Sequence, residues 1–158
     1  MHSEIIKELE VLLKNDCLIL GVGNTLRGDD GFGSLLAEEL KGKISNEVMN
    51  AGSAPENYLG KIAKINPATL LIIDTADFSG IPGEIKLVRK EELLKVNYIS
   101  THNISLELLC NFLKENRADL NIALLAAQPE SMQLGTSLSE PLQKAFNILK
   151  EKFIQIGS

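Results

Sequence analysis

The sequence predicts a single α/β domain of three layers, in which helices flank a twisted, mostly parallel sheet of about five strands. Short apolar segments of strand length alternate along the chain with helical segments, the order typical of parallel sheets. Two of these segments, "CLILGVG" (17–23) and "ATLLIIDTAD" (68–77), contain the unbroken apolar runs of strands that are covered on both faces. The 158 residues, with 44% hydrophobic side chains, suit one domain covering residues 1–158.

The first half of the chain supplies two helices and two strands. Residues 3–15 have apolar side chains at helical spacing, with Ser3 as the candidate N-cap, and predict an amphipathic helix. A strand follows over 17–23, and a shorter strand is expected at 46–51. Between them, residues 31–41 form a helix whose buried side chains are expected to be Phe32, Leu35, Leu36 and Leu40.

The second half contains three further helical segments and three strand segments. Pro55 stands in a first helical turn, where proline is tolerated, and so do Glu140 and Pro141 in the last helix. The residues "EIKLVR" alternate as in a half-exposed strand. The helices are expected at 55–65, 105–116 and 139–154, and the strands at 68–77, 84–89 and 121–127.

Composition argues against several classes of protein. A net charge of −5 and only 4% aromatic residues, with no Trp, disfavour nucleic-acid binding, which depends on cations and stacking. No apolar run approaches the roughly 18 residues of a membrane span, and the acidic N-terminus does not resemble a signal peptide, so we expect a cytoplasmic protein. Cys17 and Cys110 lack metal or redox spacing and are expected to be reduced core thiols.

The loop after the first strand, "GVGNTLRGDDGFG", starts like a nucleotide-binding loop but ends differently. Leu26 replaces the third glycine of the dinucleotide fingerprint, and Asp29 and Asp30 occupy the Lys and Ser/Thr positions of a P-loop. Two carboxylates repel a triphosphate and attract a cation. The simpler alternative is that Asp29 or Asp30 caps the following helix.

Two further candidate ligands stand where other strands or loops should reach the same edge of the sheet. Asp74 ends the run "LLII", with Asp77 close behind it, and His102 lies in the polar segment "STHNIS". Carboxylates from Asp30 and Asp74 with the His102 imidazole would form an open site for a divalent cation. Taken singly, each of these residues also has an ordinary structural explanation.

A serine hydrolase triad of Ser53, His102 and Asp74 is a weaker alternative. The sequence around Ser53 lacks the GxSxG elbow that exposes a nucleophilic serine. A nucleotide-binding protein is a further alternative, disfavoured by the two broken glycine motifs.

Six segments together resemble the [NiFe]-hydrogenase maturation endopeptidases, and especially the branch that serves formate-hydrogenlyase-type hydrogenases. In order over residues 21–130 they are "GVGNTLRGDDGFG", "AGSAPEN", "LLIIDTAD", "PGEI", "STHN" and "AAQPE". The resemblance implies one proteolytic cut, which removes a C-terminal extension from the hydrogenase large-subunit precursor after nickel insertion. It places the metal-contacting and catalytic roles on Asp30, Asp74 and His102. Residues 1–16, an extra N-terminal helix, lie outside it.

The resemblance also sets expectations for cofactor, substrate and partner. Nickel is expected to arrive with the precursor and to serve as the recognition element, while another divalent cation could bind in vitro. Asn50 departs from the family, which usually has Asp there, and Asn cannot titrate. We expect a monomer that acts as an enzyme; the alternative is a non-catalytic nickel or assembly chaperone. The residues expected to bind substrate are Gly28, Asp29, Asn50, Ser53, Thr101 and Gln128.

Overall fold

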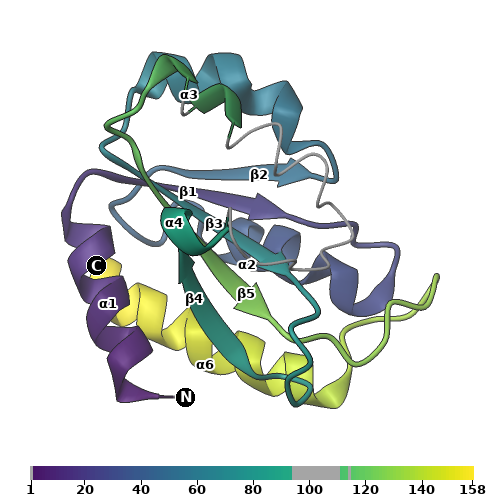
Figure 1. The fold of residues 1–158 in the computed structure, drawn as a ribbon. Coiled ribbons are helices and arrows are strands. Elements are labelled where there is room, and N and C mark those ends of the chain that lie inside the picture. The colour runs from purple at the N-terminus through teal and green to yellow at the C-terminus, as the bar shows by residue number, and fades with distance from the viewer. Residues whose placement is uncertain (1, 94–110, 114) are drawn as a thin grey trace.

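The computed structural model describes residues 2–93, 111–113 and 115–158, and its centre is a five-stranded sheet (Figure 1). The strand order is β2-β1-β3-β5-β4, in which the first four strands are parallel and β4 pairs antiparallel with β5 at one edge. This arrangement confirms the predicted fold class. The strands are β1 (Cys17–Val22), β2 (Val48–Gly52), β3 (Thr69–Thr75), β4 (Ile85–Arg89) and β5 (Asn121–Ala127).

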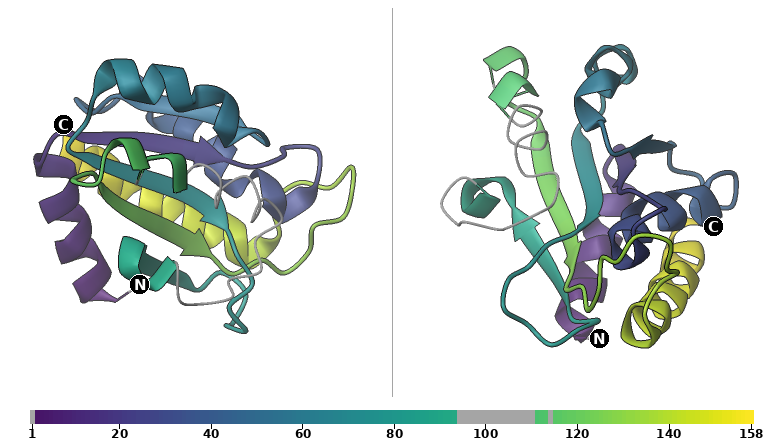
Figure 2. Two further views of the ribbon diagram at one scale, coloured as in Figure 1. Left: turned by 45° about the horizontal axis from the view of Figure 1, so that its top comes forward. Right: turned by 90° about the vertical axis from the view of Figure 1, so that its right-hand side faces the viewer.

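Helices cover both faces of the sheet (Figure 2). On one face lie α1 (Ser3–Lys14), α2 (Phe32–Leu40) and α6 (Glu140–Gly157), and on the other lies α3 (Leu59–Ile65). Shorter pieces are the 3₁₀ turns η1 (Gly28–Gly31) and η2 (Pro55–Tyr58) and the single turn α4 (Lys90–Leu93). The helix predicted at 105–116 falls mostly outside the described residues; 111–113 and 115–116 are helical.

Two apolar cores result from the alternation of side chains along the strands. Ile19 and Leu71 face the core beneath α1, α2 and α6, whereas Leu20 and Ile72 face the core beneath α3. Burial on both faces explains why β1 and the 70–73 stretch of β3 are unbroken apolar runs. The N-terminal helix is part of this packing, because α1 buries Leu9, Leu12 and Leu13 in the first core.

Three local expectations were wrong. Ser3 is the first residue of α1, while His2 occupies the N-cap without a side-chain hydrogen bond. Leu35 is 36% exposed, because it lies on the side of α2 that the sheet does not cover. Asn46 precedes β2 instead of starting it: its side-chain amide donates to the carbonyls of Leu13 and Cys17 and so fixes the turn between α1 and β1.

Cys17 behaves as the sequence predicts, as a buried free thiol. Burial raises the pKa of its thiol to about 12, so the reactive thiolate is absent at neutral pH. Cys110 lies outside the described residues. None of the helices in the described ranges combines the length and the apolar character that a membrane span requires.

Glycines let α2 approach the sheet closely at its first turn. A Cβ atom on Gly33 would overlap the carbonyl oxygens of Ile73 in β3 and Val22 in β1. A Cβ on Gly21 would overlap the Ala37 side chain and the Gly33 carbonyl. This contact holds the start of α2, and with it η1, against the ends of β1 and β3.

Replacing Gly33→Ala should therefore destabilise the fold by about 3 kcal/mol, because overpacking against backbone atoms cannot be relieved by a rotamer change. Gly60→Ala is the matched control: Gly60 lies in α3, and no atom of the described residues lies within 4 Å of the place that a Cβ would take there. At that position alanine should stabilise the helix by about 0.5–1 kcal/mol. Urea unfolding of both variants measures the difference, and equal stability of Gly33→Ala and wild type would contradict the close approach.

Candidate functional site

The carboxyl ends of β1, β2, β3 and β5 meet at one edge of the sheet, where open α/β folds bind ligands. Four of the residue positions predicted from the sequence lie at this edge: Asp30 after β1, Asn50 in β2, Asp74 in β3 and Gln128 after β5. Thr101 and His102 lie outside the described residues.

Asp30 and Asp74 are both buried at the ends of neighbouring strands. Asp30, in η1, is 1% exposed, and Asp74, the penultimate residue of β3, is 0% exposed. The turn η1 packs against β3, and the Asp74 carboxylate accepts the backbone N–H of Thr75 at 2.8 Å. Because an isolated buried carboxylate is costly, each of the two must have polar partners in its surroundings.

Asp29, a third buried carboxylate, fixes the loop that carries Asp30. Its Oδ2 accepts the backbone N–H of Glu130 and of Ser131 at 2.8 and 3.0 Å and the Ser139 hydroxyl at 2.8 Å. Its Oδ1 accepts the Ser139 backbone N–H at 2.7 Å, at the start of α6. Asp29 is 0% exposed, so these four bonds replace the water that the carboxylate has lost.

The same two loops are also joined by their backbones. Gly28 N–H donates to Thr136 O at 3.1 Å, Asp29 N–H donates to Ser131 O at 2.9 Å, and Gly135 N–H donates to Leu26 O at 2.8 Å. Gly28 has φ of 54°, and a Cβ there would overlap Thr136 and Ser131. Gly28 is therefore required for the loops to meet, a structural role that stands beside the substrate contact expected for it.

The helix-cap explanation of the two aspartates is wrong for α2. The N-cap of α2 is Gly31, and the Asp29 carboxylate bonds to the 130–139 segment instead. Asp30 lies within η1, where its carbonyl accepts the backbone N–H of Asn24 at 3.1 Å.

Asn50 is fixed by three hydrogen bonds at the end of β2. Its Oδ1 accepts the Ser34 hydroxyl at 2.6 Å and the Gly52 N–H at 3.0 Å. With the oxygen so assigned, its Nδ2 faces α2 and donates to Glu38 Oε1 at 3.0 Å. Sequence reasoning missed Ser34 and Glu38, since both appear as ordinary helix residues until β2 is placed beside them.

Gln128 closes the turn that follows β3. Its Oε1 accepts the N–H groups of Phe78 and Gly80, and its Nε2 donates to Asp77. The backbone N–H of Ser79 and, to a lesser degree, the Gln128 amide lower the pKa of the Asp77 carboxyl. Gln128 thus has a structural role, and its contact with substrate stays a prediction.

The described residues alone do not complete a metal site. Residues 2–93, 111–113 and 115–158 hold no cluster of three or more His, Cys, Asp or Glu side chains suited to a metal, which leaves the predicted third ligand, His102, outside them. Thr75, next to Asp74, is buried, and its Oγ1 has no hydrogen-bond partner among the residues that the structure describes. Ser53 is exposed after β2.

Asp29→Asn should destabilise the protein by about 2–3 kcal/mol, because an amide NH₂ would replace one acceptor among N–H donors in a buried place. Thermal and urea unfolding measure this loss. Glu130→Gln is the control on the same loop: its side chain is exposed, and we expect a change within about 0.5 kcal/mol. A loss no larger than that of the control would refute the structural role of Asp29.

Asn50→Asp should lower stability by about 1 kcal/mol at neutral pH, because the new carboxylate would face Glu38. Repulsion between charges at the surface is screened by salt, so the deficit should shrink as the ionic strength rises. Glu38→Gln in the Asn50→Asp background removes one charge and should restore stability at neutral pH. Unfolding midpoints at low and high salt test the idea, and a deficit that does not change with salt would argue against it.

Comparison with known proteins agrees with the fold and with the sequence motifs. The model of the hydrogenase maturation protease family matches residues 33–156. The hydrogenase 3 maturation protease of Escherichia coli strain K12 is 32% identical over 137 residues, which cover 85% of this chain and 86% of that protein.

Solved structures show the same relation. The [NiFe] hydrogenase maturation protease HycI from Thermococcus kodakarensis superposes with a TM-score of 0.82 at 32% identity, covering 94% of this chain and 97% of that one. The hydrogenase maturating endopeptidase HybD from E. coli gives 0.74 at 27% identity, covering 86% and 88%. The chain therefore belongs to the hydrogenase maturation protease family, a family of peptide hydrolases.

Proposed function

We propose that this protein is the endopeptidase that removes the C-terminal extension of a [NiFe]-hydrogenase large-subunit precursor, with the nickel already in that precursor as its recognition element. The observation that carries the proposal is the pair of buried carboxylates, Asp30 and Asp74, at the ligand-binding edge of a maturation-protease fold. We further propose that it acts as a cytoplasmic monomer.

The proposed ligands fit a nickel ion that the precursor supplies better than one that this protein holds permanently. Carboxylate oxygens from Asp30 and Asp74 with the imidazole of His102 are hard or borderline ligands, without the thiolates that hold nickel tightly. When nickel is presented by the precursor, it would polarise the scissile carbonyl or a water molecule. The protein's own part is to orient the precursor so that the bond to be cut lies near that ion.

Three residues of the proposed site are candidates for the general base: Asp29, Asp30 and His102. Both oxygens of the Asp29 carboxylate already accept hydrogen bonds from the 130–139 segment. Asp29 would have to give up these bonds to accept a proton, so it serves better as support. Asp30 and His102 are then the candidates for the base. The buried Thr75 Oγ1, which has no hydrogen-bond partner within the described ranges, supplies a further polar atom next to Asp74 for a bound peptide.

A non-catalytic nickel or assembly chaperone would use the same ligands without cutting the precursor. Membership of a peptide hydrolase family favours the protease. The two proposals differ in one product: only the protease shortens the large subunit.

Incubation of the purified protein with nickel-loaded and nickel-free precursor tests the proposal. We expect a loss of mass equal to a C-terminal peptide, from the nickel-loaded form alone, by intact-protein mass spectrometry. Equal cutting of both forms would refute recognition through nickel, and cutting of neither would favour the chaperone.

The same assay tests the three predicted site residues. Asp30→Asn, Asp74→Asn and His102→Ala should each reduce the cleavage rate by about 100-fold or more, as removal of electrostatic or acid–base groups does. Asp119→Asn is the matched control. Asp119 is exposed and pairs with Arg117. It precedes β5 and so lies at the amino-terminal ends of the parallel strands, away from the candidate site at their carboxyl ends. Circular dichroism must show that each variant is folded. A folded Asp30→Asn variant with full activity would remove Asp30 from the site.

A further inference from the structure

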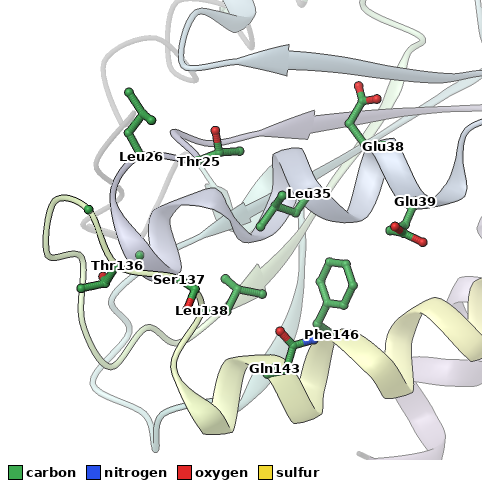
Figure 3. Close-up of a pocket in the computed structure, with 12 residues that line it drawn as sticks. Thr25, Leu26, Leu35, Glu38, Glu39, Thr136, Ser137, Leu138, Gln143 and Phe146 are labelled. Atoms are coloured by element: carbon green, nitrogen blue, oxygen red, sulfur yellow. The ribbon is translucent and has the colours of Figure 1, made fainter.

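A groove beside the candidate site is not used by the mechanism above (Figure 3). It has a volume of about 590 Å³, within the range of about 300–1,000 Å³ typical of ligand pockets. Figure 3 shows its walls: the 24–28 loop, the outer side of α2, the 135–138 loop and the first turns of α6. The apolar side chains that line it are Leu26, Leu35, Leu138 and Phe146.

Two of these apolar side chains are unusually exposed. Leu26 is 68% exposed on the loop, and Leu35 is 36% exposed on α2. Leu35 is the residue whose burial the helical pattern predicts but the fold does not provide. Exposed leucines that line one concave surface are typical of a contact site for another apolar group.

The groove lies next to the predicted catalytic centre. Gly28, which lines it, is two residues from Asp30, so the two Cα atoms lie within about 7 Å of each other. The loop between them is held by Asp29 and by its backbone bonds to the 131–136 segment. A polypeptide bound at Asp30 would therefore need only a few residues to reach the groove.

The charge at the rim of the groove is acidic. Glu39 is compensated by Lys43 at 3.0 Å and Lys150 at 3.7 Å. Glu38 is different: in the described part of the chain it has no lysine or arginine partner, and its carboxylate takes a hydrogen bond from the neutral Asn50 amide at 3.0 Å. Asn50 thus holds Glu38 in place without neutralising it.

We propose that this groove binds the stretch of the precursor polypeptide that flanks the bond to be cut, with an apolar side chain against Leu26 and Leu35 and a lysine or arginine at Glu38. Three features favour this occupant: the apolar side chains that line the groove, the Glu38 carboxylate at its rim, and the position of the groove beside Asp30. The inference rests on the proposed function for the identity of the polypeptide, but binding and cutting can be measured separately.

The first test removes the apolar floor. The double variant Leu26→Ser/Leu35→Ser should weaken binding of the nickel-loaded precursor, measured by fluorescence anisotropy, at least tenfold. Leu134→Ser is the matched control, because Leu134 is 71% exposed on the neighbouring loop and does not line the groove; we expect a change within twofold. Equal binding of the two variants would overturn the proposal.

The second test removes the charge alone. Glu38→Gln keeps an acceptor for Asn50 and should weaken precursor binding several-fold while reducing its dependence on salt. Glu4→Gln, at an exposed position of α1, should change neither. The charge-reversed variant Glu38→Lys should bind a precursor whose basic residues beside the cut are replaced by Glu more tightly than wild-type protein binds it. If it does not, the basic residue has no place in the proposal.

The outcomes separate this inference from the proposed function. If wild-type protein binds the precursor through the groove but never shortens it, the proposed proteolytic function is refuted and the role of the groove in binding is supported. If wild type cuts the precursor and the double variant binds and cuts it as Leu134→Ser does, the role of the groove in binding is refuted and the proteolytic function is supported. Loss of self-association by the double variant in sedimentation, with unchanged precursor binding, would assign the groove to a second copy of the chain and overturn the proposal.

Discussion

The arrangement of the site depends on one buried carboxylate, that of Asp29. It accepts four hydrogen bonds from three residues of a segment about one hundred positions further along the chain, including the first residue before α6. Those N–H groups would otherwise be unpaired at a loop and a helix start, and the negative charge suits the N-terminus of α6. One side chain thus joins the loop after β1 to the loop after β5 and keeps both at the edge where Asp30 lies.

The close contact of α2 with the sheet fixes the other side of that edge. Without side chains at Gly21 and Gly33, the helix rests on the backbones of β1 and β3. The turn η1 directly precedes α2. The contact of α2 with the sheet therefore also sets the position of η1 relative to β3. Asp30 is consequently positioned by rigid elements on both sides, which is what a catalytic or metal-binding carboxylate requires in order to act without reorganisation.

Patterns that depend on burial alone could be predicted from the sequence, whereas those that depend on distant partners could not. The apolar runs of β1 and β3 identify strands because both faces are covered. Asp29 and Asp30 cannot be told apart locally, because the partner that distinguishes them, Ser139, lies 110 residues away. Leu35 fits the apolar stripe of α2, and only the placement of α6 shows that it borders a groove.

The same reasoning accounts for Asn50, where the family resemblance leads one to expect an aspartate. An aspartate at this position would place a second carboxylate against Glu38, whereas an amide can accept from Ser34 and donate to Glu38 at once. The departure therefore belongs with Glu38, a residue that the motifs do not include. Glu38 also lies at the rim of the groove. The amide at position 50 is therefore linked to the acidic character of the groove, because a neutral Asn50 leaves the negative charge of Glu38 in place where a basic peptide would pass.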